Sequence, residues 1–370
     1  MKLAAIILAA GLSSRMGGFK PLLTLGGDSF LAHCARLLRQ GGVEEATVVT
    51  GHRHEEVAEE ARRLGLTVVC NPRYEEGMFS SLLAALPSLA GVDGCFLLPV
   101  DIPLVRPATV ARLAAAFDGS QTLIPSFQGR PGHPPLLAAG LLPKIAAYNG
   151  RGGLQGLLAT LPPQAVRRVP VWDRGILLDA DTPEDMRVLQ SRLIRMDSGE
   201  SEEVMELARL HMPARGMAHG LGVARAAQRI ARRLNQRGAS LDIDLVCHAA
   251  LLHDIAKGMP DHERAGQELL ASLGLSRLAD ITGAHRQAEP PASGIIGEKE
   301  VVALADKLVR GRYRVSVRQR FEEKLDMYRD DREACLSVRR RMEGALQLLA
   351  MVEAACGEDV ESIVDGGDEP

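Results

Sequence analysis

The chain has 370 residues, 46% of them hydrophobic and 25% charged, which is the composition of an ordinary globular protein long enough for two domains. Its formal net charge of −3 gives no electrostatic reason to expect nucleic acid or an anionic membrane as a partner. The six cysteines are far apart and form no C-x-x-C pair, and no apolar run approaches transmembrane length. We therefore expect reduced thiols and a cytoplasmic protein.

The amino-terminal region combines an apolar run, residues 3–8, with a loop rich in glycine, LAAGLSSRMGGFKP. The run is typical of a buried parallel strand. Gly11, Gly17 and Gly18 allow backbone N–H groups to converge on an anion, and Arg15 and Lys20 add two cations. The loop matches neither a Walker motif nor G-x-G-x-x-G. It indicates a phosphate ligand, with an ordinary glycine-rich turn as the alternative.

Beyond this loop, helix and strand patterns alternate along the chain. We expect helices at 29–40, 55–64 and 78–86, and strands at 46–50, 66–70 and 94–100. This alternation predicts an α/β domain with a doubly wound, mostly parallel sheet, whose ligands bind at the carboxyl ends of the strands.

A carboxylate follows the apolar strand 94–100 directly. Asp101, in DIP, is held by the strand before it and the proline after it, and the next helix is expected to start near Pro107. Hard divalent cations prefer carboxylate oxygen and accompany triphosphates, so Asp101 is a candidate Mg²⁺ ligand.

Three other polar stretches belong to this half. NPRYEEGMFSSL, residues 71–82, fits a loop with a helix cap at Ser80 as well as a binding segment. In GRPGHPPLL, residues 129–137, His133 fits a loop histidine bonded to backbone. GILLDADTPED, residues 175–185, predicts a short strand that ends in Asp179 and Asp181, then a helix capped near Thr182.

The pattern breaks at the polar run 195–203, beyond which only helices are expected. We predict domains at 1–194 and 204–355, the linker 195–203, and a disordered acidic tail at 356–370.

Polar residues interrupt apolar helical faces at three places in the second half. They are His219, the pair His253–Asp254 in LLHDIAK, and Asp306 in ALAD. A single buried histidine is more often a satisfied core residue, but two imidazoles and two carboxylates together suggest a bound cation. Lys257 is four residues after His253, where an ammonium could meet a substrate phosphate.

The first half resembles the molybdopterin nucleotidyltransferase-like family, whose signature LAAGxSxRMGxxK the glycine-rich loop matches. The resemblance also covers N-P-x-x-x-x-G-M-x-x-S-L, D-x-P, G-x-x-G-H-P and D-x-D-T-P-E-D. It departs at YNGRGGLQGLL, where Arg151 lies in the place of an acidic residue. The resemblance implies catalysis by Lys20, Arg15 and Asp101. It also implies that the nucleotide is bound by Leu8, Ala9, Ala10, Gly11, Ser13, Gly17, Asn71, Gly77 and Ser81. The acceptor would be bound by Gly132, His133 and Pro134. The metal would be bound by Asp101, Asp179 and Asp181.

The second half resembles the HD superfamily of metal-dependent phosphohydrolases, whose pattern H…HD…D it fills in order. The resemblance implies that His262 and His285 hold a second metal beside the ion on His219, His253, Asp254 and Asp306. Mn²⁺, Fe²⁺ or Co²⁺ suits this site, or Mg²⁺, with Lys257 on the phosphate.

These resemblances imply a bifunctional enzyme. The sequence LAAG, rather than LAGG, favours transfer of CMP from CTP to molybdopterin, the product going to a molybdenum hydroxylase apoenzyme. Two alternatives are a nucleotidyltransferase for a sugar or polyol phosphate, and a non-catalytic protein that binds and delivers a cofactor.

Overall fold

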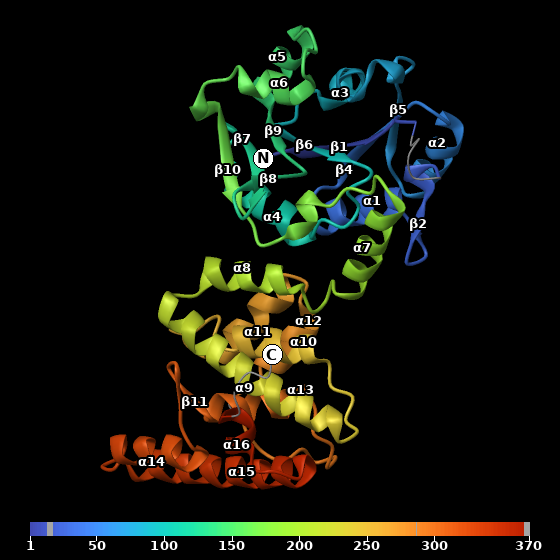
Figure 1. The fold of residues 1–370 in the computed structure, drawn as a ribbon. Coiled ribbons are helices and arrows are strands. Elements are labelled where there is room, and N and C mark those ends of the chain that lie inside the picture. Colours follow the sequence, from blue (N-terminus) through green and yellow to red (C-terminus); the bar gives the residue numbers. More distant parts are fainter. Residues whose placement is uncertain (13–17, 286, 366–370) are drawn as a thin grey trace. The chain divides into compact units, whose positions relative to one another are not determined.

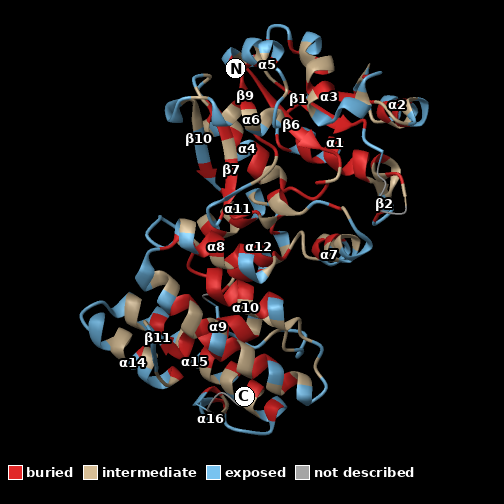
Figure 2. Cartoon of the chain, turned by 45° about the horizontal axis from the view of Figure 1, so that its top comes forward, coloured by how far each residue is buried: buried red, intermediate tan, exposed pale blue. Residues whose placement is uncertain are grey.

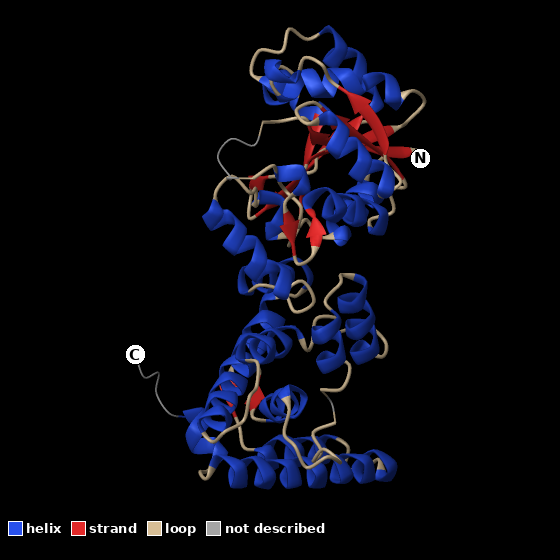
Figure 3. Ribbon diagram, turned by 90° about the vertical axis from the view of Figure 1, so that its right-hand side faces the viewer, coloured by secondary structure: helices blue, strands red, loops and turns tan. Residues whose placement is uncertain are grey.

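The computed structural model describes residues 1–12, 18–285 and 287–365 (Figure 1). The chain divides into two compact units, Met1–Arg195 and Met196–Pro370. In the described residues, the first unit is an α/β structure and the second is helical apart from one short hairpin, as the colouring of Figure 3 shows. No helix of the described ranges is long and apolar enough to cross a membrane.

An eight-stranded sheet forms the centre of the first unit, with the order β10-β7-β9-β6-β1-β4-β5 and β8 paired to β7. Strand β9 is antiparallel to its neighbours β6 and β7, while β1, β4, β5 and β6 run parallel. The strands are β1 Leu3–Ala9, β4 Glu45–Thr50, β5 Thr67–Cys70, β6 Gly94–Pro99, β7 Thr122–Phe127, β8 Arg130–Pro131, β9 Leu136–Ala138 and β10 Val166–Pro170; β2 Thr24–Leu25 and β3 Asp28–Ser29 form a separate hairpin. The predicted mostly parallel sheet is confirmed.

Strand β1 separates two layers of core. Ala5, Ile7 and Ala9 face one hydrophobic cluster, while Ile6 and Leu8 face the other. This division follows from the alternation of side chains along a strand, which here is buried on both faces (Figure 2).

Helices cover both faces of the sheet. One cluster contains residues of α1, α2, α4 and α7, and the other contains residues of α3, α5 and α6. Their bounds are α1 Phe30–Gln40, α2 His54–Arg63, α3 Met78–Ala85, α4 Pro107–Ala116, α5 Leu142–Ala147, α6 Gly153–Ala159 and α7 Pro183–Ile194.

The second unit contains helices α8 Ser201–His211, α9 Ala214–Gln236, α10 Ile243–Leu252, α11 His262–Ser272, α12 Ser276–Thr282, α13 Glu298–Lys307, α14 Val317–Met327, α15 Arg332–Cys356 and α16 Val360–Asp365. The hairpin β11 Val309–Arg310 and β12 Tyr313–Arg314 connects α13 to α14. Helix α9 packs against α10 and α13, which brings the elements that carry His219, His253 and Asp306 together.

Three segments differ from the sequence expectation. Residues 174–177 form a 3-10 helix instead of a strand, because Asp173 caps it by accepting a hydrogen bond from Gly175 N. Helix α8 already begins at Ser201, and residues 360–365 form α16, where Val360 and Val364 are buried. An acidic composition therefore did not prevent these two valines from ordering the segment.

A buried ion pair fixes α7 to the loops at the sheet edge. The Arg192 guanidinium lies 2.6 Å from Asp173 Oδ1, and both side chains are fully buried. Asp173 Oδ2 also accepts hydrogen bonds from Arg106 N and Thr109 Oγ1, at the start of α4. Arg192 Nε donates to Leu104 O at 3.0 Å.

We predict that Asp173→Ala lowers the free energy of unfolding by about 3–5 kcal/mol, because it removes a buried carboxylate that lies against the buried Arg192 guanidinium. Chemical denaturation measures this loss. The control is Glu184→Ala, which removes an exposed pair with Arg187 and should cost no more than about 0.5 kcal/mol. Equal losses in the two variants would contradict the prediction.

Candidate functional site

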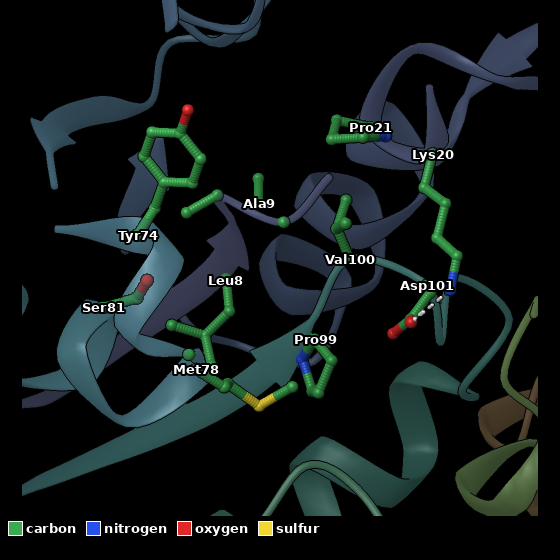
Figure 4. Close-up of a pocket in the computed structure, with 13 residues that line it drawn as sticks. Leu8, Ala9, Lys20, Pro21, Tyr74, Met78, Ser81, Pro99, Val100 and Asp101 are labelled. Atoms are coloured by element: carbon green, nitrogen blue, oxygen red, sulfur yellow. Dashed lines mark hydrogen bonds and ion pairs between the residues drawn. The ribbon is translucent and has the colours of Figure 1, made fainter. Parts of the chain in front are cut away.

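Three charged side chains of the first unit meet at the carboxyl end of the sheet. Lys20 Nζ lies 2.9 Å from Asp101 Oδ2, an ion pair that Figure 4 shows, and 2.5 Å from Asp181 Oδ1. Two carboxylates that share one ammonium form an oxygen-rich position, which fits the ligand preference of a hard divalent cation such as Mg²⁺.

Backbone geometry explains why these side chains converge. Asp101 follows β6, and its carbonyl accepts a hydrogen bond from Ala180 N at 2.9 Å, so the segment that contains Asp181 lies beside it. Thr182 and Asp185 form a capping box at the start of α7. Thr182, not Asp181, therefore caps the helix, and the Asp181 side chain reaches Lys20.

Burial alone would lower the pKa of Lys20, but hydrogen bonds to Asp181 and Asp101 outweigh it and raise that pKa. Lys20 therefore remains an ammonium at neutral pH.

A cavity of about 240 Å³ adjoins this cluster (Figure 4). Among the residues predicted to bind nucleotide, those that line it are Leu8, Ala9, Ala10, Gly11, Gly77 and Ser81, together with Lys20 and Asp101. Tyr74 and Met78 also line it, although sequence reasoning did not select them; both lie inside the NPRYEEGM stretch. Ser13, Arg15 and Gly17 lie outside the described residues.

Asn71, which the sequence also predicts to bind the nucleotide, does not line this cavity. It is buried, and its Nδ2 donates to Ser80 Oγ at 2.8 Å and Ser81 Oγ at 3.0 Å. Its Oδ1 accepts from Arg73 N. Its observed contacts therefore shape the loop that presents Gly77 and Ser81 to the cavity.

A larger cavity of about 720 Å³ lies next to the first and shares Leu8 and Met78 with it. Gly132 and His133 line it, while Pro134 is buried and is not part of the lining. Burial lowers the pKa of His133, and its Nδ1 is buried without a hydrogen-bond partner among the described residues. Asp179 is exposed, and its charge acts on His133. The structure therefore joins Asp181, but not Asp179, to Lys20 and Asp101.

The second unit brings the histidines and aspartates of the sequence motif together. His219 comes from α9, His253 and Asp254 from the turn after α10, and Asp306 from α13. His219 Nε2 lies 3.2 Å from Asp306 Oδ1 and 3.9 Å from Asp254 Oδ2. His253 Nε2 lies 3.5 Å from each of these oxygens. Ligand atoms of His219, His253 and Asp254 all lie within 4.8 Å of one another.

The imidazoles are oriented for a metal. Nδ1 of His219, His253 and His285 contacts the carbonyl oxygen of Gly311, Ala250 and Thr282, respectively, at 3.1, 2.8 and 2.6 Å. A ring whose Nδ1–H donates to a carbonyl presents its Nε2 lone pair on the other side. His253 Nε2 is buried and has no hydrogen-bond partner within the described ranges. A cation would satisfy this atom, so the cluster fits a metal.

A second group adjoins the first through Asp254, whose Oδ1 lies 3.7 Å from His262 Nε2 and 3.9 Å from His285 Nε2. Asp254 can therefore serve two ions. Lys257 lies on a turn rather than on the α10 helix; its Nζ is 2.5 Å from Asp254 Oδ2, and its side chain is 62% exposed.

Sequence reasoning missed Lys307, the residue after Asp306. Its buried Nζ lies 2.8 Å from Asp306 Oδ2 and 3.3 Å from the carbonyl oxygen of His285. Burial alone would raise the pKa of Asp306, but Lys307, His219 and His253 hold it well below its usual range. The signal that could have found Lys307 is its place directly after Asp306 in ALADK. An ammonium beside a buried carboxylate is expected to pair with it.

Comparisons with known proteins agree with this division. The MobA-like NTP transferase domain matches residues 5–167, and the HD domain matches residues 216–311. Fold and matches thus define a nucleotidyltransferase that carries a helical HD domain. The chain belongs to the MobA-like NTP transferase family.

Three relatives illustrate the similarity. The molybdenum cofactor cytidylyltransferase of Escherichia coli is 30% identical over 196 residues, which cover 50% of this chain and 95% of the relative. A protein of Synechococcus elongatus named "Probable molybdenum cofactor guanylyltransferase" is 28% identical, covering 51% of this chain and 99% of the relative. The bifunctional enzyme IspD/IspF of Rhizorhabdus wittichii is 28% identical over 353 residues, which cover 86% of this chain and 87% of the relative.

We predict that metal affinity of the His–Asp cluster falls as the pH is lowered. Burial would lower the pKa of His253, but Asp306 and Asp254 raise it, so a proton competes with the metal over a wider pH range. Burial lowers the pKa of His285 to about 4, so His285 stays neutral near pH 6. Below the pKa of His253, affinity should fall about tenfold per pH unit, the slope of one displaced proton. Competition with a chromophoric chelator measures it, and an affinity independent of pH would contradict the prediction.

Proposed function

We propose that the first unit transfers a nucleoside monophosphate from a nucleoside triphosphate to a phosphorylated acceptor and releases pyrophosphate. The observation that carries this proposal is the meeting of Lys20, Asp101 and Asp181 beside the cavity of the glycine-rich loop. In this proposal the smaller cavity takes the nucleotide, and the larger one, with Gly132 and His133, takes the acceptor.

Catalysis would depend on positioning and electrostatics. An acceptor phosphate oxygen attacks the α-phosphorus and the bond to pyrophosphate breaks, so negative charge grows on the phosphoryl oxygens. Lys20 stabilises this charge, and Arg15 is proposed to help it. Asp101 and Asp181 would hold Mg²⁺, which when bound neutralises phosphate charge. The buried Asn71 network keeps Gly77 and Ser81 in place for base and ribose.

The proposed donor is CTP and the proposed acceptor is molybdopterin, whose product would pass to a molybdenum hydroxylase apoenzyme. The LAAG sequence and the similarity to a molybdenum cofactor cytidylyltransferase support this choice. The similarity to a guanylyltransferase supports GTP as an alternative donor. The similarity to IspD/IspF supports a sugar or polyol phosphate as an alternative acceptor. A third alternative is a non-catalytic cofactor-delivery protein.

We propose that the second unit hydrolyses a phosphate ester or anhydride. Potential ligand atoms of His219, His253 and Asp254 lie together, Asp306 Oδ1 lies within 3.5 Å of both imidazoles, and the buried His253 Nε2 has no hydrogen-bond partner among the described atoms. His219, His253, Asp254 and Asp306 would hold one ion, and Asp254, His262 and His285 a second. Mn²⁺, Fe²⁺, Co²⁺ or Mg²⁺ would supply hydroxide near neutral pH. Lys257 is exposed enough to reach a substrate phosphate.

The proposed compartment is the cytoplasm. It supplies nucleoside triphosphates and keeps thiols reduced, and all six cysteines of the chain are free.

For the transferase, we predict that Asp101→Ala slows pyrophosphate release by about 10²- to 10³-fold, the loss expected when one electrostatic contact in the transition state is removed. A coupled pyrophosphate assay with CTP and molybdopterin measures this change. Asp118→Ala, on an exposed loop away from both cavities, is the control and should keep full activity. Near-normal release by a folded Asp101→Ala protein would exclude Asp101 as the metal ligand.

For substrate choice, we expect molybdopterin cytosine dinucleotide as the main product when CTP and GTP compete at equal concentration. Mass spectrometry identifies the dinucleotide. A higher kcat/KM for GTP would refute the donor assignment, and turnover only with sugar or polyol phosphates would refute the acceptor.

For the hydrolase, His253→Ala combined with Asp254→Ala should abolish both metal binding and hydrolysis of bis-p-nitrophenyl phosphate, because it removes ligands of both ions. The transferase activity of the same protein is the internal control and should be unchanged. Absence of any metal in reconstituted wild-type protein would leave the second unit a docking module.

A further inference from the structure

The second unit has a basic cavity that the proposed reactions do not use. It has a volume of about 640 Å³ and lies between the start of α9 and the hairpin β11–β12. Four arginines line it: Arg215, Arg310, Arg312 and Arg314. No carboxylate is among the described residues of its lining.

Carboxylates outside the cavity balance only part of this charge. Arg310 pairs with Glu323 at 2.5 Å, and Arg314 pairs with Asp365 at 2.6 Å. Arg312 donates to the Tyr313 hydroxyl at 3.0 Å and its guanidinium lies 5.1 Å from the centre of the Tyr313 ring. In the described part of the chain, neither Arg215 nor Arg312 has a carboxylate within ion-pair distance. Cations gathered without counter-charge repel one another, and an anion would relieve that repulsion.

Helix α14 borders the same cavity through Gln319. The next residue, Arg320, has a buried Nε without a hydrogen-bond partner among the described atoms. Burial, Arg320 and Lys307 lower the pKa of Lys324, one turn further on, to about 8. Two basic side chains, Arg320 and Lys324, therefore follow the lining residue Gln319 along α14, beside the acidic Glu322, Glu323 and Asp326.

The cavity lies next to the metal centre but is separate from it. Ala218 and Gly311 line the cavity. The Gly311 carbonyl accepts from Nδ1 of His219, while Nε2 of the same ring points to Asp306. The imidazole thus lies between the cavity wall and the ligand cluster.

Size and lining identify the chemical class of ligand. A volume of about 640 Å³ exceeds what a single phosphate needs and is in the range of cavities that hold small organic ligands. Arginine forks match phosphate oxygens, and a tyrosine that is 63% exposed offers a face for a planar ring. We propose that this arginine-lined cavity is a binding site for a nucleoside polyphosphate, distinct from the metal centre.

Isothermal titration of the full-length protein with ATP and with inorganic tripolyphosphate tests the site. EDTA in the buffer prevents hydrolysis, and a Lys20→Ala, Asp101→Ala background weakens binding at the first unit. Both ligands should bind, ATP more tightly. Adding Arg215→Ala and Arg312→Ala should weaken both by about tenfold or more, because charge-assisted hydrogen bonds are lost. Tyr313→Leu should weaken ATP alone.

The matched control is Arg264→Ala, an exposed arginine on α11 that pairs with Glu268 and does not line the cavity. It should leave both affinities unchanged, and melting curves check that every variant is folded. An absence of binding, or equal losses in Arg264→Ala and in the cavity variants, would overturn the proposal. Hydrolysis of bis-p-nitrophenyl phosphate with metal restored reports on the proposed hydrolase independently, so the two proposals can fail separately.

Discussion

The arrangement of the first unit depends on one strand that is buried from both sides. Strand β1 is hydrogen-bonded to β4 and β6, and its side chains alternate between two hydrophobic clusters. A shift of one residue would exchange the two clusters, so the register is strongly determined. Because that register is fixed, the end of β1 and the end of β6 lie next to each other. The loop after Ala9 and the carboxylate of Asp101 therefore reach the same edge of the sheet.

In both units, carboxylates of the candidate site lie beside cationic side chains, but the arrangement differs. In the first, one ammonium, Lys20, lies against two carboxylates, Asp101 and Asp181, and offsets part of their charge. In the second, Lys307 and two imidazoles surround the buried Asp306. Unpaired charges are costly inside a protein, and in the second unit the cationic neighbours hold the pKa of Asp306 well below its usual range. Asp306 is thus in the ionised state in which a cation binds a carboxylate.

Much of the fold could be predicted from the sequence, because it depends on local patterns. The continuous apolar runs of β1 and β6, the cap at Ser29 and the proline that begins α4 have direct sequence signals. Strand β9, antiparallel between β6 and β7, has only three residues, and its place depends on tertiary pairing. The 3-10 helix at 174–177 depends on Asp173, whose partners are distant in sequence.

For the candidate sites, motifs selected residue types but not their partners. The H…HD…D pattern located a cluster that the structure brings together, and the metal groups around Asp254 agree with it. In the first unit, the NPRYEEGMFSSL stretch could not indicate that Asn71 would be buried against Ser80 and Ser81. Nor could the GILLDADTPED stretch indicate that Asp179 and Asp181, two residues apart, would face different surroundings. Such differences depend on backbone direction, which the composition of a loop does not encode.

Helix α7 has a consequence for how this enzyme could change. Its first turn sets the position of Asp181 through the Thr182–Asp185 box, and its last turn contributes Arg192, which binds the backbone after Asp101 at Leu104. Each residue added to or removed from a helix rotates the remaining turns by about 100°. One inserted residue between these two anchors would turn Arg192 away from Leu104 while leaving every side chain of the cluster intact. The exposed residues of this helix are therefore free to vary, but the number of residues between Asp185 and Arg192 is not.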